Sequence, residues 1–167
     1  RRMLNAVRRI AMSSSWTGWM TWEQIEPFKD KIIEMEYEDI TTFHYKEWSI
    51  PHSYCELKVS ELQDHLANGN TYFWGAIENN ELVAYWWCYS APFIDRKRFH
   101  IRSAMTVESA RGKGLGKLAC QEVIQKASEL GCDDIATHYV VENESMAALM
   151  DYMGFKKTRV EVIKTLS

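Results

Sequence analysis

The chain has 167 residues, of which 46% are hydrophobic and 26% are charged, and its formal net charge is −3. Such a chain can bury a full core, and we expect a single domain over residues 20–167 behind an N-terminal extension at residues 1–19. No apolar run approaches the roughly 20 residues that a membrane helix needs, so no membrane span is expected. Basic residues cluster only in residues 1–9, which argues against nucleic-acid binding.

The four cysteines have neither a CxxC pair nor the spacing of metal ligands, so no metal site is expected. A domain of this size does not depend on disulfides, and we interpret the cysteines as reduced thiols. Residues 1–12 lack the apolar core and the small-residue cleavage site of a secretory signal. Together these features predict a cytoplasmic location.

The first half of the chain predicts two helices. Residues 22–37 place apolar side chains at helical spacing, with Thr21 as the expected N-cap. An irregular aromatic stretch follows. A second, shorter helix is expected to be capped by Ser60 and to end near Gly69.

Three strands are expected next. Residues 71–78 and 81–90 are rich in β-branched and aromatic residues, and the Asn79-Asn80 pair between them suits a hairpin turn. Residues 98–107 alternate with period two. One face of this third strand is expected to carry Phe99, Ile101, Ser103, Met105 and Val107.

The last part alternates helix and strand. A helix is expected from Gly114 to a C-terminal cap at Gly131, followed by a strand over residues 134–140. Asn143 is expected to cap another helix, and residues 155–163 are expected to form a final strand. This order predicts a mixed α/β fold.

The segment Arg-Gly-Lys-Gly-Leu-Gly at residues 111–116 lies where the third strand ends and a helix begins. Backbone N–H groups at a helix start lack intrahelical partners, and glycines let an anion approach them. The helix dipole adds about half a positive charge. The segment therefore predicts a phosphate site, with Arg111 and Lys113 at its rim; a simple Gly-rich connection is the alternative.

Two other phosphate-binding motifs do not match this segment. A Walker loop needs Gly where Arg111 stands and Ser or Thr where Leu118 stands. A dinucleotide-binding GxGxxG that starts at Gly112 would need Gly at Lys117.

The pattern Arg-x-x-Gly-x-Gly, carried by Arg111, Gly114 and Gly116, resembles the acetyl-CoA signature of the GNAT superfamily of N-acetyltransferases. Residues 143–155, which open on Asn and close on Gly-Phe, are similar to the downstream helix of that family. The resemblance covers about residues 71–164 in its order of elements. It implies a mixed, mostly antiparallel central sheet flanked by helices and splayed between the strands before and after the helix that follows the loop.

The resemblance also implies that acetyl-CoA is the co-substrate, held between the splayed strands, and that an amine attacks its thioester directly. The expected cofactor-binding residues are Met105, Val107, Arg111, Gly112, Lys113, Gly114, Leu115, Gly116 and Asn143. Met105 and Val107 are expected to offer backbone groups to the pantetheine arm, and Asn143 to lie beside it.

One position departs from the family. Many members have a Tyr seven residues after the helix-opening Asn that can protonate the thiolate, but Met150 stands there. Tyr152 is turned about 200° around the helix from that position and is expected to point elsewhere. His138 is the candidate base or proton relay, with His100 and Glu108 as weaker candidates, and the alternative for His138 is a structural residue.

Aromatic and acidic residues are concentrated before residue 55 and in the hairpin, and they suit a small cationic amine as acceptor. The acidic residues are Glu34, Glu36, Glu38, Asp39 and Glu47, and the alternative is an ordinary solvated helix face. A protein or peptide acceptor, or a non-catalytic acyl-CoA-binding module, are the other functions that the sequence leaves open. Trp16, Trp19 and Trp22 suit either the domain itself or a homodimer interface.

Overall fold

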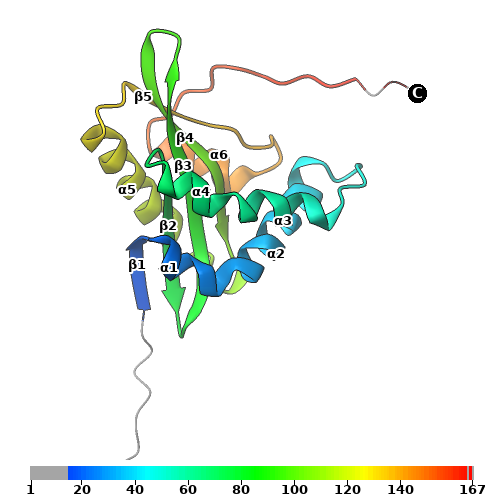
Figure 1. Ribbon diagram of the computed structural model, residues 1–167. Helices are drawn as coiled ribbons and strands as arrows, with labels where there is room; N and C mark the ends of the chain where they lie inside the picture. Colours follow the sequence, from blue (N-terminus) through cyan, green and yellow to red (C-terminus); the bar gives the residue numbers. More distant parts are fainter. Residues whose placement is uncertain (1–14, 165, 167) are drawn as a thin grey trace, which may run out of the picture.

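The computed structural model describes residues 15–164 and 166. Five strands form one sheet in the order β1-β2-β3-β4-β5, in which only the last pair is parallel (Figure 1). The strands are β1 (Ser15–Trp19), β2 (Thr71–Glu78), β3 (Glu81–Phe93), β4 (Arg96–Thr106) and β5 (Asp134–Thr137). The predicted mixed, mostly antiparallel sheet is confirmed. Its first strand comes from the segment expected to be an extension, whose residues 1–14 lie outside the described part.

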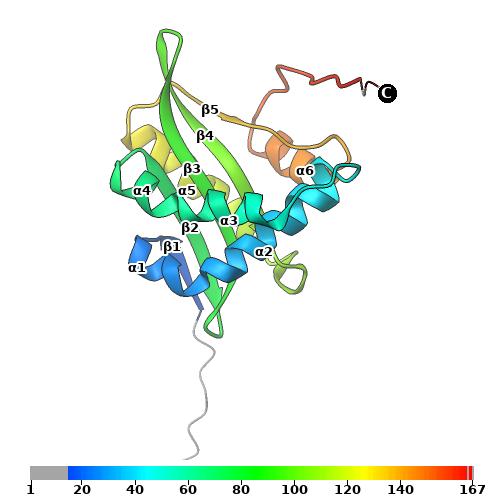
Figure 2. The ribbon, with the colours of Figure 1, turned by 45° about the vertical axis from the view of Figure 1, so that its right-hand side comes forward.

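Helices cover both faces of this sheet (Figure 2). One face carries α1 (Trp22–Ile25), the 3₁₀ turn η1 (Glu26–Phe28), α2 (Lys29–Asp39), the π-helical turn η2 (Ile40–His44), α3 (His52–Ser60) and α4 (Leu62–Ala67). The other face carries α5 (Leu115–Glu129) and α6 (Glu144–Tyr152), and the 3₁₀ turn η3 (Glu108–Ala110) precedes α5. Each layer encloses its own apolar cluster, and both clusters share the sheet between them.

The helix expected at residues 22–37 is present with a 3₁₀ interruption at Pro27 and continues to Asp39. The predicted cap at Ser60 is wrong. Ser60 is the last residue of α3, and its hydroxyl donates to the carbonyl of Leu57. The aromatic stretch before Ser60 therefore contains the helix α3, which its composition did not predict.

The hairpin prediction is confirmed, because Asn79 and Asn80 adopt φ of 52° and 65° between β2 and β3. Both residues lie in the left-handed region that a type I′ turn requires. The four cysteines are free, and Cys55, Cys88 and Cys120 are buried.

A bulge in β4 interrupts the expected alternation. Trp87 pairs with Ser103 and Cys88 pairs with Ile101, so Arg102 is the extra residue on β4. An inserted residue exchanges the two faces of a strand. Accordingly Ile101 joins the cluster beneath α5, whereas Met105 joins the cluster beneath α2, and the prediction that both share one face is wrong.

The sheet splays beyond this bulge. β5 pairs with β4 only from Arg98↔Asp134 to Ile101↔Thr137, after which β4 continues to Thr106 paired with β3 alone. The strand expected over residues 134–140 is thus shorter than predicted. This opening between β4 and β5 was expected from the family resemblance, and it is confirmed.

The final strand expected over residues 155–163 is wrong, since residues 155–164 contain no strand. Val160 and Val162 are 84% and 88% exposed. Their β-branched side chains favour extended backbone, but a strand also needs a neighbouring strand to pair with.

Candidate active site

The loop before α5 presents a row of free backbone donors. In the described chain, none of the N–H groups from Gly112 to Lys117 has a hydrogen-bond partner, and the first intrahelical bond runs from Leu118 N to Gly114 O at 3.0 Å. No side chain caps the helix. Gly112 and Gly114 have φ of 75° and 81°, and a Cβ on either would meet open space. Clustered donors at the start of a helix fit the diphosphate of a nucleotide cofactor.

The charged residues of this loop are held by the protein. Arg111 Nε donates to the carbonyl of Thr106 at 3.2 Å, and Lys113 Nζ lies 2.8 Å from Glu78 Oε2. Gly116 also has a packing role, because a Cβ there would lie 3.2 Å from Leu149 Cδ2. That glycine lets α5 pack against α6.

The register of β4 identifies which backbone groups face the splay. Val107 N donates to Val83 O at 2.9 Å, so residues 107 and 105 form their hydrogen bonds with β3. The backbone N–H and C=O groups of Ala104 and Thr106 then point to the other side, where β5 has ended. This differs by one residue from the expectation of Met105 and Val107.

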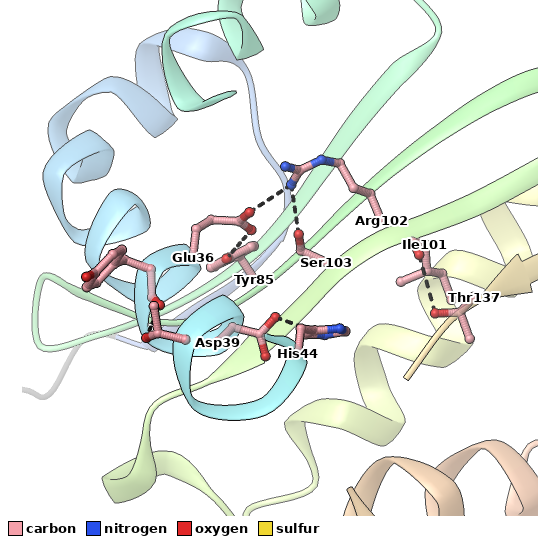
Figure 3. A network of polar contacts seen from close by, with 10 residues as sticks. Glu36, Asp39, His44, Tyr85, Ile101, Arg102, Ser103 and Thr137 are labelled. Atoms are coloured by element: carbon pink, nitrogen blue, oxygen red, sulfur yellow. Dashed lines mark hydrogen bonds and ion pairs between the residues drawn. The ribbon is translucent and has the colours of Figure 1, made fainter. Parts of the chain in front are cut away.

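A small cleft of about 30 Å³ lies at the splay. Its wall combines α2, η2, β4, the end of β5 and the start of α6, and includes Asp39, His44, Arg102, Ser103, Ala104, Thr137, His138, Tyr139, Asn143 and Met146. Figure 3 shows Asp39 and His44 on their helical turns facing the β4 ribbon. A larger cavity of about 370 Å³ lies over β3 and is lined in part by Tyr54, Trp87 and Tyr89. Arg102 borders both spaces.

The fold and its loop match a known protein family. The model of the acetyltransferase (GNAT) family matches residues 33–155, which is most of the chain. The chain belongs to this family. It is therefore an N-acetyltransferase, and acetyl-CoA is its co-substrate.

Two relatives from Bacillus subtilis (strain 168) are similar along almost their whole length. The uncharacterized N-acetyltransferase YdgE is 29% identical over 153 residues, covering 88% of this chain and 95% of YdgE. The uncharacterized N-acetyltransferase YycN is 25% identical over 161 residues, covering 90% of this chain and 99% of YycN.

Solved structures confirm the fold. A predicted acetyltransferase with acetyl-CoA from Clostridium acetobutylicum has a TM-score of 0.72 at 15% identity, covering 91% of this chain and 96% of the other. The aminoglycoside N-acetyltransferase AAC(6')-Iy in complex with CoA has a TM-score of 0.67 at 11% identity, covering 93% and 96%.

The residues of α6 match the pattern of the GNAT family at the opening Asn143 but differ from it at Met150. Asn143 caps α6 by accepting from Met146 N at 3.0 Å, which leaves its side-chain NH₂ free to donate into the cleft. Met150 is 2% exposed and belongs to the core. Tyr152 points outward, as expected, and its hydroxyl accepts from Lys117 Nζ at 2.7 Å. Neither side chain delivers a proton to the cleft.

The candidate catalytic residues are separated by the structure. His138 lines the cleft. His100 stacks on Tyr89 with ring centroids 4.6 Å apart, and burial, followed by Arg98 and His138, lowers its pKa. Neither His100 nor Glu108 lines the cleft.

The sequence analysis expected Asp39 only among the acids that attract an amine, and it did not place His44 or Arg102 at the cleft. Asp39 and His44 are five residues apart, a separation that an ordinary α-helix does not place on one face. Arg102 is brought to the cleft by the bulge in β4, which the alternating sequence pattern of that strand does not predict.

Arg102 belongs to a polar network in this acetyltransferase (Figure 3). Its guanidinium donates to Glu36 Oε2 at 2.9 Å and to Ser103 Oγ at 2.8 Å, and it lies 3.9 Å from the centroid of the Trp87 ring. Tyr85, which is fully buried, donates to Glu36 Oε1 at 2.6 Å. Burial, followed by the charge of Glu36, raises the pKa of Tyr85 well above 10.

In residues 15–164 and 166, no helix is long and apolar enough to cross a membrane. The same residues contain no group of three or more side chains suited to a metal ion.

Proposed function

We propose that this acetyltransferase acetylates a small-molecule primary amine by direct attack on the thioester of acetyl-CoA. The amides of residues 112–117 would hold the pyrophosphate, the free backbone groups of Ala104 and Thr106 would hold the pantetheine arm, and Asn143 would lie beside that arm. The observation that carries the proposal is the position of Arg102. This one residue borders both the splay and the larger cavity, so the two spaces adjoin at its side chain. The amine would bind in the cavity and the thioester in the splay.

The cavity suits a compact acceptor. A volume of about 370 Å³ is near the lower end of small-molecule pockets. Tyr54, Trp87 and Tyr89 contribute aromatic rings to its wall. Arg102 lies 3.9 Å from the Trp87 centroid and His100 stacks on Tyr89, so an ammonium group would use the remaining ring faces. These features favour a small amine over a peptide as the acetyl acceptor.

The cationic character of the acceptor rests on fewer acids than the sequence suggested. Glu36 is paired with Arg102, Asp39 with His44, and Glu34 with His52 at 2.9 Å. Glu61, which lines the cavity, is likewise paired, with Lys58 at 3.7 Å. We propose that the exposed Glu38 and Glu47 supply the remaining attraction.

The experiment is release of free CoA from acetyl-CoA with a panel of amines. The panel contains spermidine, kanamycin, an amino acid amide and a peptide with a free N-terminus. The proposal predicts the highest kcat/KM with the small cationic amines. Turnover of the peptide alone would overturn the acceptor class, and CoA binding without turnover of any amine would indicate a non-catalytic binding module.

A further inference from the structure

A carboxylate and an imidazole meet at the wall of the cleft. His44 Nε2 lies 3.4 Å from Asp39 Oδ2. They are brought together by the π-helical turn η2, in which Tyr45 N donates to Ile40 O at 2.8 Å across five residues. Such turns align residues five apart and recur at functional sites. In the described chain, His44 Nδ1 has no hydrogen-bond partner.

This pair stands where the two substrates would meet. His44 shares the cleft of about 30 Å³ with Ala104 of β4 and Asn143 at the start of α6. It projects from the layer that covers the acceptor side of the sheet, whereas the pantetheine arm would enter from the side of α5. A group in this position can contact both the incoming nitrogen and the departing sulfur.

Transfer of an acetyl group to an ammonium acceptor requires two protons to leave the nitrogen. At neutral pH an alkyl amine is an ammonium ion, and it attacks only after losing a proton. The new C–N bond then forms, the C–S bond breaks, and the sulfur leaves as a thiolate that needs a proton. Met150 is apolar and buried, so it cannot serve either step.

We propose that His44 is the catalytic base and that Asp39 is its positioning residue. His44 takes the ammonium proton from the acceptor nitrogen and returns that proton to the CoA thiolate. The second proton, which the nitrogen loses as the amide forms, passes to solvent, so both protons are accounted for. The inference rests on the proposed function and adds the group that moves the proton. It is analogous to other carboxylate-imidazole pairs, in which the carboxylate orients the ring and stabilises the imidazolium.

The electrostatic surroundings support a base that works near neutral pH. The hydrogen bond to Asp39 raises the pKa of His44 above 6.5, burial opposes it, and the charges of Asp39 and Glu36 also raise it. The other titratable or charged groups in the cleft are Arg102, His138 and Tyr139. Among the described residues His138 has no carboxylate partner, which distinguishes it from His44.

The test measures CoA release with two small nucleophiles, ethylamine and hydroxylamine. Ethylamine is protonated at pH 7, whereas hydroxylamine is mostly neutral and has less need of a base. The variants are His44→Gln, Asp39→Asn, Asp39→Glu and His138→Gln. His52→Gln is the matched control, because His52 hydrogen-bonds to Glu34 and Glu56 at 2.9 Å but does not line the cleft.

We expect His44→Gln to lower kcat with ethylamine by about 10²- to 10⁴-fold, with the KM for acetyl-CoA unchanged. With hydroxylamine, kcat should fall by less than tenfold. A structural defect would lower kcat equally with both nucleophiles. Asp39→Asn should move the rising limb of the pH profile to lower pH, because it lowers the pKa of His44, and Asp39→Glu should restore it.

An equal loss with both nucleophiles, or activity of His44→Gln equal to that of His52→Gln, would overturn the assignment. So would a loss selective for ethylamine in His138→Gln alone. Absence of CoA release by the wild-type protein with every amine would overturn the proposed function itself, and the assignment with it.

Discussion

The hydroxyl of Tyr85 donates to the carboxylate of Glu36 at 2.6 Å and joins β3 to α2. Glu36 uses its second oxygen for Arg102, so one carboxylate holds the helix layer and the bulged strand together. Its side chain is only 11% exposed. A buried carboxylate that loses a donor bears a large desolvation cost.

Tyr85→Phe should therefore destabilise the protein by about 1.5–3 kcal/mol, as for other hydrogen bonds to charged groups. Urea unfolding at pH 7 measures this change. Tyr89→Phe is the control, because no hydrogen bond of the Tyr89 hydroxyl is found in the described chain, and it should change stability by less than about 0.5 kcal/mol. Equal losses in the two variants would contradict the role of the Glu36 bond.

Gly114→Ala should weaken acetyl-CoA binding by roughly ten- to hundredfold, because it displaces backbone donors to a charged group. It also places Ala at a φ of 81°, which costs about 1–2 kcal/mol of stability. Gly131→Ala is matched for this strain, with a φ of 66° and open space around the new Cβ at the other end of α5. Calorimetric titration with CoA should show weak binding for Gly114→Ala and normal binding for Gly131→Ala. Equal affinities would refute the loop as the pyrophosphate site.

Ala104→Pro removes the N–H that faces the splay and keeps the hydrogen bonds of β4 to β3. We expect the KM for acetyl-CoA to rise about tenfold, because roughly one hydrogen bond to the cofactor is lost. Thermal stability should change little, because the hydrogen bonds of β4 to β3 remain. Ala104→Ser changes the side chain and retains the N–H, so it should bind like the wild type. If the serine variant loses as much affinity as the proline variant, the side chain rather than the backbone is responsible.

Most of what surrounds the donor site could be predicted from the sequence, because it depends on local chemistry. Glycines at 112 and 114, the Asn79-Asn80 turn and the Asn143 cap each act within a few residues. The acceptor side could not be predicted in this way. The bulge at Arg102 and the π-turn that joins Asp39 to His44 are set by packing between α2 and the sheet, and period-two or helical patterns do not record them.

Arg98 and Asp134 hold the closed end of the splay. The guanidinium forms two hydrogen bonds with the carboxylate, at 2.6 and 2.9 Å, between β4 and β5. The pair is partly exposed, so Asp134→Asn should cost no more than about 1 kcal/mol at pH 7.

The contribution of this pair should depend on pH. The hydrogen bond to Arg98 lowers the pKa of Asp134 below 3.8, so the folded state favours the carboxylate. The resulting stability is present above pH 3.8 and is lost as the pH falls through the lower, folded-state pKa. Urea midpoints of the wild type and Asp134→Asn should differ at pH 7, begin to converge near pH 3.8 and coincide only below the folded-state pKa of Asp134. A difference that does not change with pH would contradict the ion pair.

The most direct test is a crystal structure of the protein with acetyl-CoA. We predict the pyrophosphate within hydrogen-bond distance of the amides of residues 112–117, and the pantetheine arm between β4 and β5 on the backbone groups of Ala104 and Thr106. The thioester should lie in the cleft that His44 lines. A pyrophosphate bound away from these amides, or an arm that does not enter the splay, would contradict the account.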